Sequence, residues 1–111
     1  MNTIVTSRHF KAHAELVDYA KDAAEKLDHY YDGIIKCEIK LSYHKAQNSV
    51  KVAEVIVSVY KQKITAKVES DDYHKSIDGA IVKALAQVKK YKDKLHAKDR
   101  IQVRRVQSKA D

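Results

Sequence analysis

The apolar residues near the start of the chain change from an alternating spacing to a helical one. Residues 2–7 alternate in the manner of a short β-strand. Beyond them, apolar residues recur at steps of three and four, which is the spacing of one face of an α-helix. These residues are Leu16, Ala20, Ala23, Leu27 and Tyr30. The pattern predicts a helix from about His13 to Tyr31, and Asp32-Gly33 is its expected stop.

From Ile34 the spacing of apolar residues changes to two, and this change predicts three consecutive strands. A polar turn is expected at residues 45–49 and a hairpin turn at residues 60–63. Strands joined in this way are expected to form an antiparallel meander with one covered face. The residues expected on the covered face are Ile35, Cys37, Ile39, Leu41 and Tyr43, then Ala53, Val55, Val57 and Val59, then Ile64, Ala66 and Val68.

The last predicted element is a second long helix that follows Ser70-Asp71-Asp72. These residues supply N-cap candidates and negative charge at the positive end of the helix. The expected apolar face of this helix consists of Ile77, Ile81, Ala84, Leu85, Val88 and Leu95, with Tyr91 at the edge. The resulting order is β-α-β-β-β-α, an α+β fold in which a four-stranded sheet carries two helices on one face.

The composition fits one compact domain of the cytoplasm. The chain has 111 residues, 44% of them hydrophobic, and no apolar run approaches the roughly 20 residues of a membrane span. The first ten residues lack the apolar core of a signal peptide, and Cys37 has no second cysteine with which to pair. Both features predict a protein of a reducing compartment, without a membrane partner.

The net positive charge of the chain is confined to its C-terminal end. Residues 83–111 hold ten Lys and Arg against three Asp and Glu, whereas residues 1–82 hold twelve of each. A neutral body with one basic end is typical of a protein that binds a polyanion, because neutralising phosphates releases condensed counterions. The plainer alternative is a basic surface that only keeps the protein soluble.

The second helix carries a row of basic residues that points away from its apolar stripe. Residues 80–95 contain five lysines and one acid, so ion pairs along the helix cannot account for the lysines. Three of the lysines lie within about 40° of one another, a glutamine fills the gap in their row, and two further lysines widen the surface on another flank. The residues expected to contact the phosphates of RNA or DNA are Lys83, Lys90, Lys94, Lys92, Lys89 and Gln87. The alternative is an ordinary solvated helix face.

Residues 97–111 form a basic, polar tail that we expect to be flexible. Arg100, Arg104 and Arg105 would let the tail order on an RNA groove, and a solubilising extension is an equal alternative. The first helix differs, because Lys26 and its neighbours are interspersed with acids as on a salt-bridged solvent face. Charge alone therefore does not make the first helix a binding surface.

No arrangement of residues points to catalysis, a small-molecule substrate, a metal or a cofactor. Six histidines are scattered over different elements, and none stands at a reliable metal-ligand spacing from Cys, Asp or Glu. Cys37 alternates with apolar neighbours and is expected to be a core thiol. The chain has no Gly-rich phosphate loop and no nucleophile elbow. Tyr19, Tyr30, Tyr43 and Tyr91 are expected in the core rather than stacked on bases.

Two segments make the chain resemble a known family. Residues 72–94 combine an acidic residue before an aromatic, the step Ile77-Asp78-Gly79 and a Lys-rich end. Upstream, residues 26–32 have Lys-Leu, an aromatic pair and Asp at the end of the first helix. In order and spacing, over roughly residues 2 to 95, the chain resembles the ribosome hibernation promoting factors, a family that includes the ribosome-associated inhibitors.

The resemblance implies a fold like that of double-stranded-RNA-binding domains and an action without chemistry. Family members bind the small ribosomal subunit between head and body, where messenger RNA and transfer RNAs would sit. The implied partner is that subunit, through its ribosomal RNA and with ribosomal proteins as further candidates. The implied function is to block translation and to protect idle ribosomes under stress or in stationary phase. By position, Lys83, Lys90, Lys92 and Lys94 match the family's basic second helix, and Lys26 matches the lysine of its first-helix motif.

The resemblance divides the chain into a ribosome-binding domain at residues 1–96 and the tail at residues 97–111. The chain looks like the short form of the family, which is associated with ribosome pairing, but whether it promotes or opposes pairing stays open.

A general double-stranded-RNA-binding module is one alternative function, and it predicts comparable affinity for an RNA duplex and the subunit. A regulator that binds a protein through the exposed sheet face is another, and it predicts binding that salt does not weaken.

Overall fold

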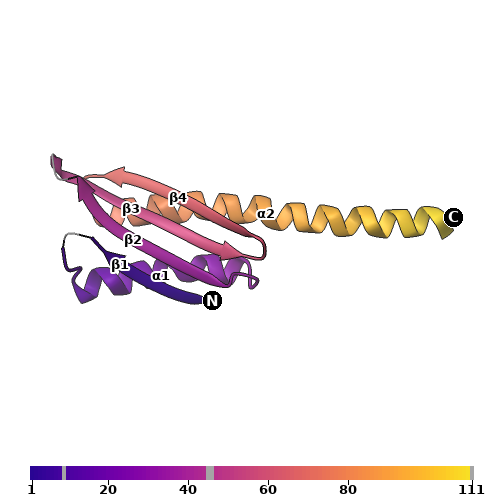
Figure 1. Cartoon of the computed structure of the whole chain (residues 1–111), viewed down its shortest axis with the longest axis horizontal. Coiled ribbons are helices and arrows are strands. Elements are labelled where there is room, and N and C mark those ends of the chain that lie inside the picture. Colours follow the sequence, from indigo (N-terminus) through magenta and orange to yellow (C-terminus); the bar gives the residue numbers. More distant parts are fainter. Residues whose placement is uncertain (9, 45–46, 111) are drawn as a thin grey trace.

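The computed structural model describes the backbone of residues 1–8, 10–44 and 47–110, and the side chains of residues 1–8, 10–44 and 50–95. Its elements are β1 (Asn2–Ser7), α1 (Ala14–Tyr30), β2 (Lys36–His44), β3 (Gln47–Val59), β4 (Gln62–Ser70) and α2 (Tyr73–Ala110). Figure 1 shows both helices on one side of the sheet, with α2 continuing past the end of the sheet. The predicted β-α-β-β-β-α fold is confirmed.

The strands lie in the order β1-β2-β3-β4, so they form one mixed sheet. β2, β3 and β4 are antiparallel neighbours, which confirms the predicted meander. β1 lies parallel to β2, and α1 forms the crossover that a parallel pair requires. The register places Ile39 of β2 beside Val55 of β3 and Val55 beside Ala66 of β4, so side chains of three strands meet in one row under the helices.

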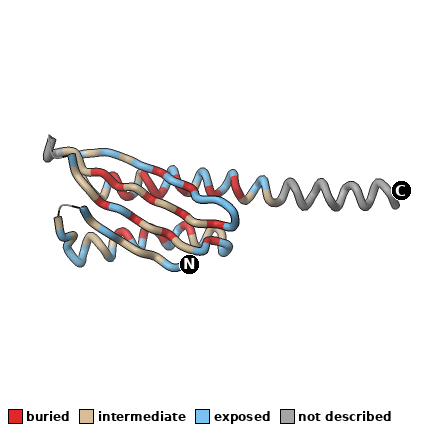
Figure 2. The backbone as a smooth tube through the Cα atoms, in the orientation of Figure 1, coloured by how far each residue is buried: buried red, intermediate tan, exposed pale blue. Residues whose placement is uncertain are grey.

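The core lies between the sheet and the two helices, and most of the residues that the spacing of apolar positions predicted belong to it. Ala24, Ile34 and Ala80 also belong to the core, although they were not predicted, and Leu16 and Tyr30 are only partly buried. Figure 2 shows buried positions that alternate along the strands and recur along both helices. Val68, Leu85 and Leu95 are partly buried at its margin. Tyr91, expected at the edge of the helix stripe, is only 8% exposed and belongs to the core. The fully or almost fully buried side chains include Ala20, Ala23, Leu27, Cys37, Ile39, Leu41, Ala53, Val55, Val57, Val59, Ile64, Ala66, Ile77, Ile81, Ala84 and Val88.

Three predictions at the ends of strands are wrong. Ile34 is 3% exposed and Ile35 is 61% exposed, although Ile35 was expected to face the core. The reason is that β2 begins only at Lys36; Ile35 precedes it and its backbone N–H donates to the carbonyl of Ser58 at 2.9 Å. The predicted turns at residues 45–49 and 60–63 are both too long, because β3 already begins at Gln47 and β4 at Gln62.

The two ends of α2 differ in how they relate to the sheet. Near its start, Gly79 packs on β4, where an added Cβ would lie 3.2 Å from the nearest methyl of Val68; the glycine thus permits a close approach. At the other end, the backbone of α2 continues to Ala110 through the segment predicted to be a tail. The flexibility of residues 97–111 and a domain boundary after residue 96 stay predictions.

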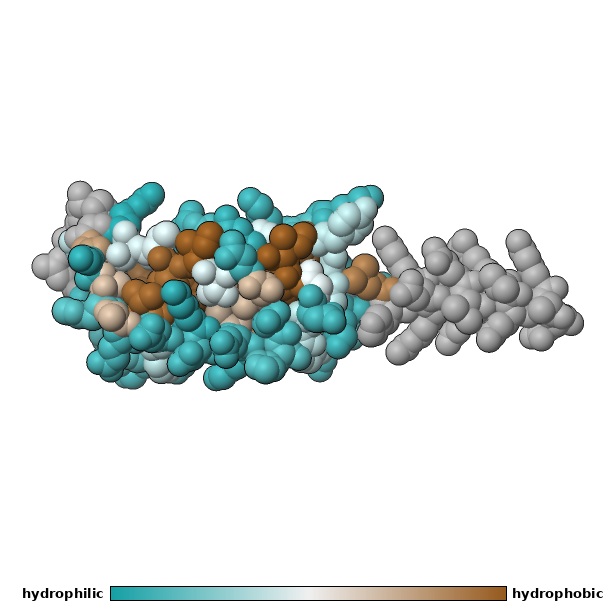
Figure 3. Space-filling model, turned by 90° about the horizontal axis from the view of Figure 1, so that it is seen from below, coloured by the Kyte–Doolittle hydropathy of each residue, from teal (hydrophilic) through white to brown (hydrophobic). Residues whose placement is uncertain are grey.

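Figure 3 views the molecule from the side on which β1 and α1 lie. Hydrophobic side chains gather in a band along the middle of this face, and hydrophilic side chains border the band on both sides. Val5, Leu16 and Tyr19 of β1 and α1 are only partly buried against the core, because β1 is the edge strand here.

Within the residues the structure describes, no helix is long and apolar enough to cross a bilayer.

Candidate functional site

The predicted row of basic residues lies on one exposed flank of α2. Lys83, Gln87, Lys90 and Lys94 are all exposed. The side-chain amide of Gln87 donates a 3.0 Å hydrogen bond to the backbone carbonyl of Thr65 in β4. Residues at steps of three, four and seven share one side of a helix, so the three lysines follow the flank that Gln87 places beside the edge strand β4. We call these four residues the β4-side row.

The lysines of the β4-side row carry charges that no acidic side chain among the described residues neutralises. Neither they nor Lys89 form an ion pair with any residue of the described part of the chain. Lysines elsewhere do form ion pairs, such as Lys75 with Asp71 at 3.3 Å. Like charges on one helix flank repel one another, and an anion placed over them removes that cost. The row is therefore suited to binding a polyanion such as a nucleic-acid backbone.

Lys92 lies on the opposite flank of α2, against the end of α1. Its Nζ donates to the backbone carbonyl of Tyr30 at 3.4 Å and lies 4.8 Å from the centre of the Tyr30 ring. A cation here satisfies a carbonyl at the C-terminus of α1 and sits favourably at the negative end of that helix. Lys92 is half-buried, so its first role is to join the two helices, and its expected RNA contact stays a prediction.

Pairing of the helices brings Lys26 of α1 toward α2. Asp78 and Lys92 of α2 contact Tyr19 and Tyr30 of α1 respectively, so the helices run side by side in the same direction. Lys26 comes seven residues after Tyr19 and four before Tyr30, which places it on the flank of α1 that faces α2.

Lys89 of α2 precedes Lys92 by three residues, and it therefore lies on the side of α2 that is turned toward α1. Lys26 and Lys89 are both exposed. The structure therefore groups Lys26 with the lysines of α2, which the acid-rich sequence around it had concealed.

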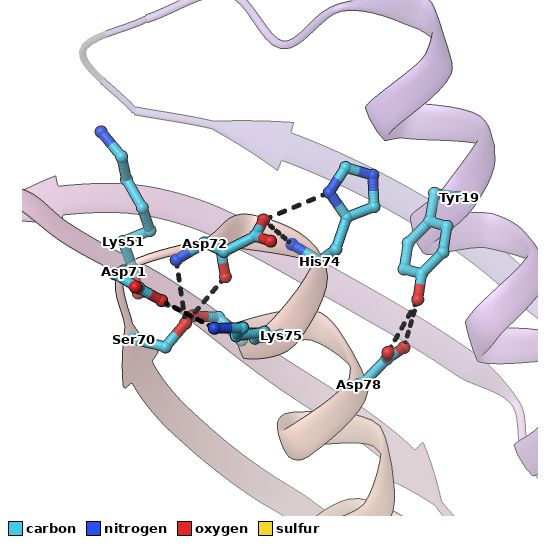
Figure 4. Close-up of polar contacts among 9 residues, drawn as sticks. Tyr19, Lys51, Ser70, Asp71, Asp72, His74, Lys75 and Asp78 are labelled. Atoms are coloured by element: carbon cyan, nitrogen blue, oxygen red, sulfur yellow. Dashed lines mark hydrogen bonds and ion pairs between the residues drawn. The ribbon is translucent and has the colours of Figure 1, made fainter.

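The start of α2 is fixed by a hydrogen-bond network, shown in Figure 4. Asp72 Oδ1 accepts the backbone N–H of His74 at 2.9 Å, as expected for the predicted N-cap, and this bond lowers the pKa of Asp72. Ser70 Oγ donates to the carbonyl of Asp72 at 2.7 Å and lies 2.6 Å from Ser76 Oγ. Ser76 is fully buried and donates to the carbonyl of Lys51 at 2.8 Å. The network anchors α2 to the sheet.

A second anchor joins α2 to α1 through two residues that sequence reasoning did not connect. The hydroxyl of Tyr19 lies 2.7 Å from each carboxylate oxygen of Asp78 and donates to it. This hydrogen bond is the main cause of a raised pKa for the Tyr19 phenol. The His74 ring meets the Tyr19 ring edge-on, with 4.5 Å between the ring centres. The pair is separated by 59 residues, so nothing local in the sequence signals it.

The tyrosines range from buried to exposed, and only some of them pack in or against the core as predicted. Tyr91 is buried as expected, and Tyr19 and Tyr30 are partly buried against the core. Tyr43 is half-buried, with its ring centre 6.2 Å from that of Phe10. Tyr60, at the turn between β3 and β4, is 68% exposed.

The remaining titratable groups that the structure describes are a buried thiol, scattered carboxylates and histidines, and a basic hollow on the sheet. Cys37 is fully buried, which confirms a core thiol, and burial raises its pKa to about 11. Among the described residues, no group of three or more His, Cys, Asp and Glu side chains could hold a metal ion. A shallow hollow of about 320 Å³ on the outer sheet face is lined by Arg8, Lys40 and Lys67, but also by the carboxylate of Glu54. What the arrangement can do is bind an anion by Coulombic attraction.

The side chains of Arg100, Arg104 and Arg105 lie outside the residues that the structure describes. Their predicted contact with RNA stays a prediction.

Comparison with known proteins adds independent evidence. Residues 3–96 match the family described as "Sigma 54 modulation protein / S30EA ribosomal protein". A ribosomal subunit interface protein from Coxiella burnetii has a similar structure, with a TM-score of 0.76 and 24% identity over 84% of this chain and 99% of that chain. The N-terminal domain of Thermus thermophilus Protein Y is also similar, with a TM-score of 0.72 and 25% identity; the match covers 82% of this chain and 99% of that chain. A search of curated proteins finds no match.

Proposed function

Because the chain belongs to the sigma 54 modulation protein / S30EA ribosomal protein family, we propose that it is a ribosome hibernation factor. It binds the small ribosomal subunit in the channel for messenger RNA and transfer RNA, and thereby blocks translation. The bound state stabilises inactive ribosomes under stress or in stationary phase. The protein acts in the cytoplasm by binding alone, without a catalytic step or a cofactor.

The observation that carries this proposal is a set of exposed lysines on α2 and α1 that form no ion pair with any described residue. Lys83, Lys90 and Lys94 form the β4-side row, while Lys89 and Lys26 lie on the side where the two helices meet. Lysine is a mobile point charge, so it tracks phosphates and does not read bases. Several such contacts give an affinity that falls steeply with salt, at about 0.7 to 0.9 log units per phosphate for each log unit of salt.

The test is sedimentation of purified ribosomes and small subunits through sucrose gradients with the protein added. Lys83, Lys90 and Lys94 are replaced by Glu in one variant, and binding is compared at about 50 mM and 200 mM salt. The proposal expects the unmodified protein to comigrate with the small subunit and the whole ribosome, more weakly at the higher salt. The triple variant is expected to stay at the top of the gradient while its circular dichroism remains helical.

A matched control carries the same charge change on another surface: Lys11→Glu, Lys40→Glu and Lys67→Glu. These lysines are exposed and lie on the β1–α1 connection and on the strands, away from α2. Comigration of the control but not of the α2 variant supports the helix surface. Normal binding by a folded α2 variant would refute it, and loss of binding only in the control would point to the sheet face and a different partner.

Affinity for RNA alone separates the proposal from a general RNA-binding module. A plain RNA duplex should bind much more weakly than the small subunit, because the channel presents phosphates on a surface of matching shape. Equal affinities for the duplex and the subunit would favour the general module. Binding that does not change with salt would instead favour a protein partner.

A further inference from the structure

We propose that the turn between β3 and β4 is a stacking site for an unpaired base of RNA, with the flanking phosphates held by lysines of the turn and of α2. The site consists of Tyr60, Lys61, Lys63, Lys90 and Lys94. The inference rests on the proposed function, and it adds to that function a contact with single-stranded RNA.

The ring of Tyr60 is exposed to solvent, because the core does not use it, and the ammonium of Lys61 lies over it. Tyr60 is 68% exposed, while Val59 and Ile64 on either side of the turn are 4% and 2% exposed and supply the apolar contacts there. The other large hydrophobic residues found exposed in the described part of the chain are Met1, Ile35 and Val82, none of which is aromatic. An exposed aromatic face next to basic residues is the feature on which bases stack in proteins that bind single strands.

The backbone that carries this ring is anchored to α2. The hydroxyl of Tyr91 donates to the backbone carbonyl of Tyr60 at 3.0 Å, so the buried side of α2 is hydrogen-bonded directly to the turn. Two residues separate the strands, and Lys61 adopts a φ of 63°, a conformation that a lysine rarely takes. Such backbone strain persists where the surroundings fix the conformation.

Positive charge surrounds the ring and continues onto α2. Lys61 Nζ lies 5.4 Å from the centre of the Tyr60 ring, and Lys61 and Lys63 are both exposed. Lys90 directly precedes Tyr91, and Lys94 comes one helical turn after it. Because Tyr91 contacts Tyr60, the end of the β4-side row reaches the turn. Figure 1 shows the β3–β4 turn beside α2 at the point where the helix leaves the sheet.

The ligand that fits this surface is a flexible single strand and not a duplex. Residues 59–66, which include the turn and the first part of β4, contain two lysines and one glutamine but no Asp or Glu, and the Glu54 carboxylate lies farther along the sheet, opposite Lys67. In a duplex the base faces are covered by their neighbours, and only an unpaired base can stack on a side chain. Every base has a π-face, so we expect little preference for sequence.

The experiment measures binding of a fluorescent oligouridine of about 12 nucleotides and of an RNA duplex of the same length by anisotropy. Tyr60 is replaced by Ala, by Leu, which keeps apolar area without a ring, and by Phe, which keeps the ring. Loss of one stacked base predicts that Y60A and Y60L bind the single strand about 5-fold to 150-fold more weakly, with Y60F close to the unmodified protein. The slope of affinity against salt should not change, because no charge is removed.

A crosslink provides a readout that does not depend on the variants. Oligouridine that carries 5-iodouracil is irradiated with the unmodified protein, and mass spectrometry should place the adduct on Tyr60. The inference is overturned if Y60L binds as well as Y60F, if the variants weaken duplex and single strand equally, or if the adduct maps elsewhere. Ribosome sedimentation of the same variants separates the two proposals, since comigration of the unmodified protein preserves the proposed function even when the Tyr60 result is negative.

Discussion

The side-chain amide of Gln87 donates a hydrogen bond to the backbone carbonyl of Thr65, with 3.0 Å between nitrogen and oxygen. The residue that interrupts the lysine row on α2 is therefore a contact between the helix and the edge strand β4. It orients the flank of α2 that carries the cations, and this explains how a neutral side chain can belong to a basic surface.

Replacing Gln87 by Lys should separate the two roles of this position. The new charge completes the row, so we expect the slope of log affinity against log salt for ribosome binding to steepen by about 0.7 to 0.9. The lost hydrogen bond lies at an exposed edge where water can replace it, so the free energy of unfolding should fall by only about 0.5 kcal/mol. Gln87→Met is the control, with the same loss of stability and no change in slope. An unchanged slope in Q87K would place the RNA on another surface.

The Tyr19–Asp78 contact should make stability depend on alkaline pH. Tyr19→Phe removes the donor and should lower the free energy of unfolding by about 0.5 to 1 kcal/mol at pH 7, a value discounted because Asp78 is exposed. The pKa of Tyr19 is raised in the folded protein, so its stabilisation is present below the unfolded pKa of about 10 and is lost as pH rises through the folded pKa.

Urea unfolding of both proteins between neutral and alkaline pH checks this prediction. Tyr31 and Tyr73 also have raised pKa values, and comparison with Y19F cancels their effect. The stability difference between the two proteins should shrink with rising pH. A constant difference would mean that the hydroxyl does not donate to Asp78.

The N-cap of α2 should give a stability that depends on acidic pH. The folded pKa of Asp72 is lowered, chiefly by the backbone N–H of His74, so its stabilisation is complete above the unfolded pKa of about 4 and is lost as pH falls through the folded value. Asp72→Ala should lower the free energy of unfolding at pH 7, because the N-cap hydrogen bond is lost. Asp72→Asn keeps an oxygen acceptor and should retain most of the stability at pH 7 but lose the acid-dependent part. Urea unfolding at neutral and acidic pH measures the stability of both variants. If D72N loses as much stability in acid as the unmodified protein does, other carboxylates cause the acid dependence.

The thiol of Cys37 should be inert in the folded protein. It is fully buried on β2, and burial raises its pKa to about 11, so almost no thiolate is present near pH 8. Ellman's reagent is expected to label it only as fast as the protein unfolds, and immediately in denaturant. Rapid labelling of the folded protein at pH 8 would show that β2 opens readily to solvent.

The fold could be predicted because every element has an unambiguous spacing of apolar residues. The inward faces of β3 and α2 follow directly from alternation and from steps of three and four. Ile34 and Ile35 are the exception, because two adjacent isoleucines give no alternation, and the hydrogen bond from Ile35 to Ser58 decides where the strand begins. The spacing of residues within one strand cannot reveal a hydrogen-bond partner on another strand.

The candidate site could be predicted only in part, for a related reason. Helical spacing placed Lys83, Lys90 and Lys94 on one flank, and their exposure agrees with it. The sequence does not say which flank of α2 meets α1, so it could not show that Lys92 rests on Tyr30. Nor could it show that Tyr60 is held by Tyr91, since the two residues are 31 positions apart.

The parallel pairing of β1 with β2 has a consequence for the order in which the protein assembles. Asn2 lies beside Lys36 and Ser7 beside Leu41, so each partner is 34 residues away along the chain. During synthesis the first strand is made long before its partner, and it has no neighbour until α1 and β2 have followed. Pulsed hydrogen exchange should show the amides of β1 becoming protected no earlier than those of β2. The strand at one edge of the sheet is then secured no earlier than β2, although it precedes β2 along the chain.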